Sequence, residues 1–533
     1  MRAIVACLLT LGLSMAQEHS HAPTGEKPVD LYKGLGIWHH PIRSSNAEAQ
    51  KFFDQGLALM YGFNRYEALR SFRKAAELDP SAAMAYWGMA MAQGPYVNMD
   101  GDAEYNMTAS CEAAESGLKI TSAPEHERAY LLAAAARCPE YQPQPYTEAM
   151  RSLAARWPDD LDALTLYAES LLVPVRWHWY ANDGTPAAGV ADAEHALEEV
   201  MRRWPDHPGA NHLYIHAVES SRNPERAIPS AQRLMGIMPW AGHMVHMPGH
   251  IWLVLGDYEL AASVNERAVA VDREYLSRTL VTHSGYGAYY IHNLHFVAYA
   301  RWMQGRQADG LRAAEDMAAS LRVIAETMPE MADAFNSVTI FGRVRFHDWD
   351  GILKMPQPTE SMHQSLAMWR YARAEAFAAR GDRAAGRQEQ AALEAIRAGL
   401  PADAMIGYNK ASDVLGLALE IVEARLAAKP AEAVPHWQRA VAIQDNFNYD
   451  EPPDWFYPVR ESLGAALLRS GNAVEAEAVF REGVKRSPRN GRMLFGLMES
   501  LRSQGKDEDA AWVKREFDAA WAKADIQLTL AEM

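Results

Sequence analysis

The chain has 533 residues, more than one compact core accommodates, so its length predicts several domains or a repeat array that grows by stacking. Hydrophobic residues make up 49% of it and charged residues 23%, which excludes disorder over most of the chain. The formal net charge of −16 disfavours anionic membrane surfaces and nucleic acids, so we expect no nucleic-acid partner.

The N-terminal residues have the pattern of a secretory signal peptide. Arg2 precedes a short apolar run, residues 3–13, and Ser14-Met15-Ala16 has the small residues typical of a cleavage site. We expect cleavage after Ala16, residues 17–45 as an extension, and a periplasmic or secreted protein. The run is too short to span a bilayer and no apolar segment of 18 or more residues follows, so we expect no membrane span.

Two cysteines remain if the signal peptide is removed, Cys111 and Cys138. In an oxidising compartment they can form one disulfide. They can equally be two small buried residues, and their spacing does not distinguish these alternatives.

Helix-forming residues at helical spacing, separated by short Pro/Gly turns, run through nearly the whole chain. Positions 8, 20, 24, 27 and 32 of one 34-residue unit are occupied by Gly56, Ala68, Phe72, Ala75 and Pro80. Small residues allow two helices to touch, the aromatic ring fills the gap between them, and proline ends the second helix. This pattern predicts a helix-turn-helix repeat.

The same register recurs towards the C-terminus and in the middle of the chain. Gly464, Ala476, Phe480 and Pro488 occupy positions 8, 20, 24 and 32 of a later unit, and two central units begin 34 residues apart, at 208 and 242. We predict an all-α solenoid of about twelve helix pairs.

These repeats resemble the tetratricopeptide repeat (TPR) family, and the chain is similar to a group of secreted bacterial TPR proteins with a His-rich central segment. The segments that carry this resemblance are 48–56, 85–88, 246–250 and 292–295. The predicted organisation is N-terminal units over 46–206 with an insertion near 173–188, central units over 207–326 with an insertion near 273–290, and C-terminal units over 327–533.

Histidines are concentrated in the central units. The chain has 19 of them, and an even spread would place about three in residues 207–295. That window instead contains nine: His207, His212, His216, His243, His246, His250, His283, His292 and His295.

The resemblance implies that positions 2, 5, 9, 12 and 13 of each unit's first helix line a concave groove. Seven histidines from three consecutive units occupy positions 2, 5 or 9: His212, His216, His243, His246, His250, His292 and His295. Glu219 occupies position 12 and Tyr299 position 9. His207 falls in a turn and is expected to be structural, whereas His283, in an insertion, is a possible additional ligand beside Glu219.

Helical spacing supports this grouping without the family. Histidines three or four residues apart share one helix face, so two imidazoles can reach one ion. Pro248 should kink the helix that carries the central triplet. Imidazole is a preferred ligand of transition metals, so the pattern predicts one or two ions of copper or zinc, with iron as a further candidate.

Aromatic and polar residues near the insertions, Trp177, His178 and Tyr286, are either groove-lining substrate contacts or packing residues. The zincin, P-loop and nucleophile-elbow motifs are missing from the sequence, so the catalytic residues are unassigned.

Three functions stay open at this point. The first is a metal-dependent oxidase or hydrolase, the second a metal-free module that binds a peptide, a partner protein or a small-molecule ligand in the groove, and the third a periplasmic metal carrier. Structural histidines between helices are the plainest alternative.

Overall fold

The computed structural model describes residues 27–98, 105–279, 286–325 and 329–533. The predicted signal peptide and His283 lie outside these residues. The described chain consists of helices apart from one hairpin of two-residue strands, which confirms the prediction of an all-α fold. None of the described helices is both long and apolar enough to cross a membrane.

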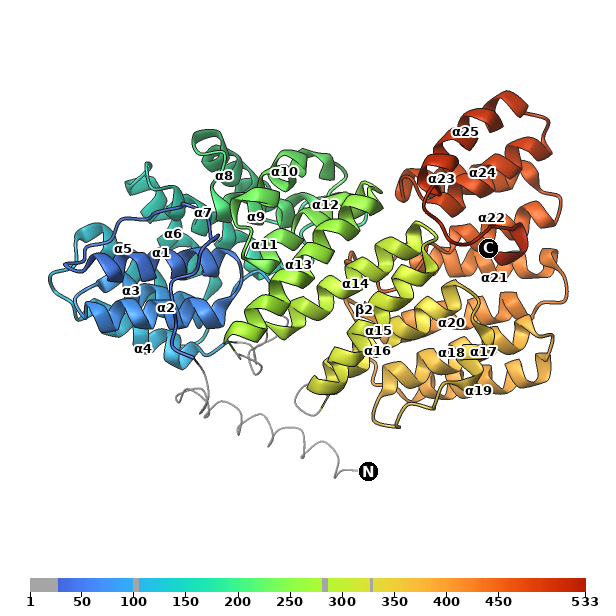
Figure 1. The fold of residues 1–533 in the computed structure, drawn as a ribbon, viewed down its shortest axis with the longest axis horizontal. Helices are drawn as coiled ribbons and strands as arrows, with labels where there is room; N and C mark the ends of the chain where they lie inside the picture. The colour runs from blue at the N-terminus through green and yellow to red at the C-terminus, as the bar shows by residue number, and fades with distance from the viewer. Residues whose placement is uncertain (1–26, 99–104, 280–285, 326–328) are drawn as a thin grey trace.

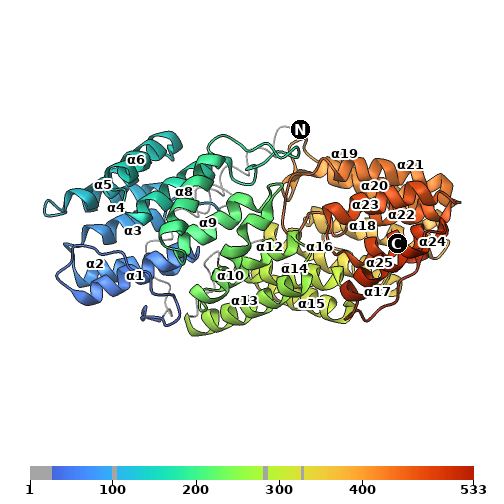
Figure 2. The same ribbon diagram turned by 90° about the horizontal axis from the view of Figure 1, so that it is seen from above.

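The helices follow one another along an elongated coil, with the N-terminal helices at one end and the C-terminal helices at the other (Figures 1 and 2). The first part contains α1 (Ala47–Tyr61), α2 (Arg65–Leu78), α3 (Ala83–Ala92), α4 (Met107–Leu118), α5 (Glu125–Ala135), α6 (Pro143–Arg156), α7 (Leu161–Leu172), the 3-10 helix η2 (Val173–Val175) and α8 (Val190–Arg203). The central part contains α9 (Pro208–Glu219), η3 (Pro224–Ala227), α10 (Ile228–Ile237), α11 (Gly242–His246), α12 (Pro248–Val254), α13 (Tyr258–Thr279), α14 (Gly287–Met303), α15 (Gln307–Ile324) and α16 (Pro329–Arg345). The last part contains α17 (Trp349–Lys354), α18 (His363–Ala379), α19 (Arg383–Gly399), β1 (Met405–Ile406), β2 (Asn409–Lys410), α20 (Ala411–Leu426), α21 (Pro430–Gln444), α22 (Arg460–Arg469), α23 (Ala473–Arg486), α24 (Gly491–Ser503), α25 (Asp507–Ala520) and η4 (Leu530–Glu532).

The small-residue positions of the repeat pack as the register predicts. The ring of Phe72 is buried between α1 and α3, and a Cβ atom on Gly56 or Gly88 would stand 2.7 or 2.4 Å from it. Phe480 has the same place between α22 and α24, where a Cβ atom on Gly464 or Gly496 would stand 2.5 or 2.1 Å from its ring. Glycine is therefore required wherever the aromatic ring enters between two helices.

The two predicted insertions have different outcomes. Residues 173–189 leave the helix pairs as η2 and a loop, closed by an isolated bridge between Tyr180 and Pro186. The insertion expected near 273–290 lies partly in α13, which continues through Arg273 to Thr279, and partly in 280–285, outside the described residues; α14 begins at Gly287. No proline interrupts residues 273–279, so the helix extends instead of forming a loop.

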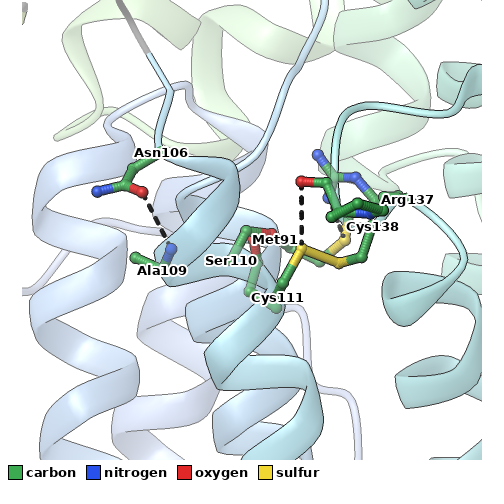
Figure 3. The surroundings of a disulfide bond; sticks show 9 residues. Met91, Asn106, Ala109, Ser110, Cys111, Arg137 and Cys138 are labelled. Atoms are coloured by element: carbon green, nitrogen blue, oxygen red, sulfur yellow. Dashed lines mark hydrogen bonds between the residues drawn. A yellow bond between two sulfur atoms is a disulfide. The ribbon is translucent and has the colours of Figure 1, made fainter. Parts of the chain in front are cut away.

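A disulfide joins Cys111 in α4 to Cys138 just beyond α5, with a Cα–Cα distance of 5.8 Å (Figure 3). The structure thus selects the first of the two alternatives left open by the sequence. The bond ties α4 to the end of α5, next to the buried side chain of Arg137.

Candidate metal centre

Helix α9 presents two of the predicted ligands and an acidic residue. His207 caps its N-terminus, because its Nδ1 accepts the backbone N–H of Ala210, and the helix begins at Pro208. All twelve residues of α9 are buried, so His212, His216 and Glu219 lie inside the molecule.

Pro248 interrupts the next histidine-bearing helix, as predicted. Helix α11 ends at His246 and α12 begins at Pro248, because proline has no N–H to continue the ladder. The interruption leaves the Nε2 atoms of His246 and His250 only 2.6 Å apart. A glycine follows, and a Cβ atom on Gly249 would stand 2.4 Å from Nδ2 of Asn265, so this glycine lets α12 approach α13 closely.

Six of the seven predicted histidines gather into two groups of three, the central His cluster. The first triad is His212, His216 and His243, and the second triad is His246, His250 and His292. Within each triad, one potential ligand atom from every residue lies within 4.8 Å of the others. The Nε2 atoms of His212 and His243 are 3.1 Å apart.

Oxygen atoms hold the Nδ1 atoms of four of these imidazoles. The pairs are His212 with the Tyr61 carbonyl at 2.5 Å, His216 with Glu219 Oε1 at 3.0 Å, His246 with Asn265 Oδ1 at 2.6 Å, and His250 with Glu219 Oε2 at 2.6 Å. Each oxygen can only accept, so each Nδ1 donates and Nε2 is left to face the cluster. Metal-binding histidines are oriented in this way.

Burial keeps most of these imidazoles neutral. It lowers the pKa of His212, His243, His246 and His292 well below the ordinary value, and that of His216 to about 3. Burial also opposes the charged form of His250, but the adjacent carboxylates of Glu219 and Glu451 raise its pKa to about 10. Neutral imidazole is the form that binds metals.

Glu451 is a member of the site that the sequence analysis missed. It lies in the connection between α21 and α22, and its Oε1 is 3.1 Å from Nδ1 of His250. Burial raises the pKa of both Glu219 and Glu451, and among the described residues no Lys or Arg pairs with either carboxylate. The two acids therefore rely on nearby imidazoles, or on a bound cation, for charge compensation.

Aromatic rings surround the cluster. Phe63 lies 4.3 Å from His212 between ring centroids, Tyr289 lies 4.4 Å from His243, and Phe296 lies 4.8 Å from His246. This wall shields the fully buried imidazoles from solvent and strengthens any charge interaction inside it, whereas His292 is half-buried.

Three predicted site residues lie away from the cluster. His295 belongs to neither triad: although it is three residues from His292 on α14, its ring packs against that of Phe335 of α16, 5.9 Å away between centroids. Tyr299 is buried near Arg345 and Glu461. His178 is exposed on its loop, so its role as a groove-lining residue stays a prediction.

Two aromatic predictions have different surroundings. The ring of Trp177 lies 6.1 Å from that of His216 and stacks on Tyr408, so it borders the cluster. The hydroxyl of Tyr286 donates to the buried carboxylate of Asp272 at 2.8 Å and is a packing residue.

A second buried group, the Asp162 hub, lies beside the cluster. Its carboxylate accepts from four side chains: Trp38 Nε1 at 3.0 Å, His40 Nδ1 at 2.7 Å, Tyr61 OH at 2.5 Å and His207 Nε2 at 3.2 Å. The hub fastens the N-terminal extension to α1, α7 and α9. His40, Asp160 and Asp162 also have the proximity of a metal site, but the imidazoles at Asp162 are already bonded to that carboxylate.

No family model matches the chain, and no curated protein matches its sequence. Among solved structures it is similar to the P58(IPK) TPR domain, at 12% identity over 87% of this chain and 99% of that one, with a TM-score of 0.21. The match to human IFIT1, in its dimer with PPP-AAAA, covers 90% of this chain and 92% of that one at 12% identity, with a TM-score of 0.32. The match to yeast Tom70 covers 91% of this chain and 93% of that one at 11% identity, with a TM-score of 0.28.

The chain has a TPR-type α-solenoid fold. Its helix pairs and their glycine–phenylalanine packing show this.

Proposed function

We propose that this solenoid is a scaffold that binds one or two transition-metal ions, copper or zinc in the first place and iron as a further candidate, in its central His cluster. One observation carries the proposal. Oxygen acceptors hold four Nδ1 atoms, and the Nε2 atoms that remain face one another. The Nε2 atom of His216 is buried and has no hydrogen-bond partner among the described residues, as expected of an atom that ligates a metal ion.

Burial favours an ion over a peptide as the ligand. The histidines of the first triad are at most 1% exposed, so a peptide in a groove would not reach them in this conformation. It also favours a tightly held ion over a carrier that exchanges its cargo rapidly, because ion release requires the surrounding helices to separate.

We also propose that the protein is exported. The N-terminal pattern supports this, as does the Cys111–Cys138 disulfide, since such bonds persist in oxidising compartments. The mass of the protein recovered from the periplasm or the medium should correspond to a chain that begins at Gln17. An intact N-terminus in that fraction would contradict cleavage after Ala16.

Elemental analysis tests the metal proposal. Protein purified without a tag, stripped with a chelator and reconstituted with Zn²⁺ or Cu⁺ should retain at least one ion per chain after dialysis. His246→Ala with His250→Ala should reduce the content while the far-UV circular dichroism stays helical. The matched control is His178→Ala with His195→Ala, because both histidines are exposed. Metal content that does not rise on reconstitution contradicts the proposal.

A further inference from the structure

The two triads have no residue in common. Helix α9 and the start of α11 supply the first triad, whereas the end of α11, α12 and α14 supply the second. Zinc and copper bind up to about four nitrogen ligands at about 2.0–2.1 Å. Six imidazoles arranged as two sets of three therefore exceed the needs of one ion and match those of two.

The triads are in contact. The ring centroids of His216 and His250 are 5.5 Å apart, and those of His243 and His246 are also 5.5 Å apart. Two ions bound here would be close neighbours, and their mutual repulsion requires negative charge nearby.

Glu219 supplies that charge and connects the two sets. Its Oε1 accepts from His216 of the first triad and its Oε2 from His250 of the second. Both imidazoles thereby turn Nε2 towards their own triad. A single carboxylate, without a Lys or Arg partner among the described residues, orients one ligand in each site.

Glu451 makes a direct contact with one triad only. It contacts His250 of the second triad, and it comes from the connection between α21 and α22, far along the chain. Its direct contact is thus with the second triad, whereas on His216 of the first triad it acts only through space, as a nearby negative charge.

Resting on the proposed function, we infer that the cluster is a dinuclear centre: Glu219 is a positioning residue for both ions, and Glu451 is a positioning residue for the ion of the second triad alone. A chelator-stripped full chain titrated with Co²⁺ or Zn²⁺ should bind two equivalents. His212→Ala with His243→Ala should leave one, in the second site. His246→Ala with His292→Ala should leave one, in the first site.

These two double variants isolate each site. Glu219→Gln offers one acceptor oxygen in place of two and should weaken binding about 10–100-fold in both backgrounds. Glu451→Gln should weaken metal binding to a similar extent in the background that keeps the second site, and much less in the background that keeps the first site, where Glu451 makes no direct contact. The exposed Glu225→Gln is the matched control and should change neither. Helical circular dichroism checks the fold of each variant.

A spectroscopic signature separates two neighbouring ions from two distant ones. The wild type with two equivalents of Cu²⁺ should show dipolar broadening or loss of the electron paramagnetic resonance signal, and each double variant with one equivalent should not. One equivalent in the wild type, or an equally large Glu451→Gln effect in both backgrounds, would overturn the inference while leaving the proposed function intact. Zero equivalents would overturn the proposed function itself.

Discussion

The Asp162 hub and the central His cluster are both buried and both contain histidines. They differ in which atoms the imidazole nitrogens contact. In the hub, His40 and His207 each direct one nitrogen to a carboxylate that also accepts from Trp38 and Tyr61. In the cluster, oxygen atoms accept from Nδ1, whereas Nε2 atoms lie against one another or, at His216, have no hydrogen-bond partner among the described residues. The hub histidines therefore link segments of the fold, and the converging Nε2 atoms are what the proposed metal site requires.

Tyr61 connects the two regions. Its hydroxyl donates to Asp162 at 2.5 Å, and its backbone carbonyl accepts from His212 at the same distance. The hub therefore holds the end of α1 in place, and that end orients one ligand of the first triad. We therefore expect substitutions in the hub to act mainly on stability and substitutions in the cluster to act mainly on metal binding.

The largest expected effect is on the hub. Asp162→Asn should destabilise the protein by about 3–5 kcal/mol, because it removes the buried charge to which four donors are bonded. Urea and thermal unfolding followed by circular dichroism measure the loss. The control is Asp159→Asn, whose side chain is 99% exposed. A loss no larger than that of the control would contradict a stabilising role for the hub.

Metal addition should stabilise the chain through the cluster alone. When the free metal concentration is 100 times the Kd of a site, binding at that site raises the free energy of unfolding by about 2.7 kcal/mol. The wild type and Asp159→Asn should both melt at higher temperature with Zn²⁺, and His246→Ala with His250→Ala should show a much smaller shift. An equal shift in that double variant would place the ions elsewhere.

The two regions should respond to acid in opposite directions in metal-free protein. Burial holds the pKa of His216 at about 3, so below pH 6.5 the unfolded chain binds a proton that the folded chain does not, and stability falls by about 1.4 kcal/mol per pH unit. His40 has a raised pKa: burial opposes the shift, but bonding to Asp162 outweighs it. The stability that His40 contributes is therefore present at low pH and is lost as the pH rises through its raised pKa.

Urea unfolding midpoints, measured between pH 5 and 8 with a chelator present to keep the protein metal-free, test these opposite pH dependences. His216→Asn should flatten the acid side of the stability profile, and His40→Gln should steepen it. Parallel profiles for the wild type and His216→Asn would show that this imidazole is not held neutral.

The smallest expected effect concerns His295. Although the repeat register assigns it to the groove, it faces Phe335, so His295→Ala should leave the metal stoichiometry unchanged. Loss of one equivalent would mean that α14 rotates when metal binds.

The repeat register predicted much of the architecture and part of the candidate site. Glycine and phenylalanine at fixed offsets specify the helix pairs, as Gly56, Gly88 and Phe72 show. The same offsets located α9, α11 and α14 as neighbouring helices with histidines, and proline chemistry located the break at Pro248. These are local properties, because helical periodicity and backbone sterics act over a few residues.

Packing between distant segments specified the remainder. Glu451 reaches His250 from 201 positions later, and the Tyr61 carbonyl meets His212 from 151 positions earlier. Contacts between residues so far apart along the chain produce no periodic pattern in the sequence. The fate of His295 shows the same limit: spacing says which residues share a helix face, but the buried neighbours of that face decide which of them can meet one ion. Local spacing thus supplies the imidazoles, and long-range burial of carboxylates and carbonyls gives them their orientation, because those oxygens need a donor once water is excluded.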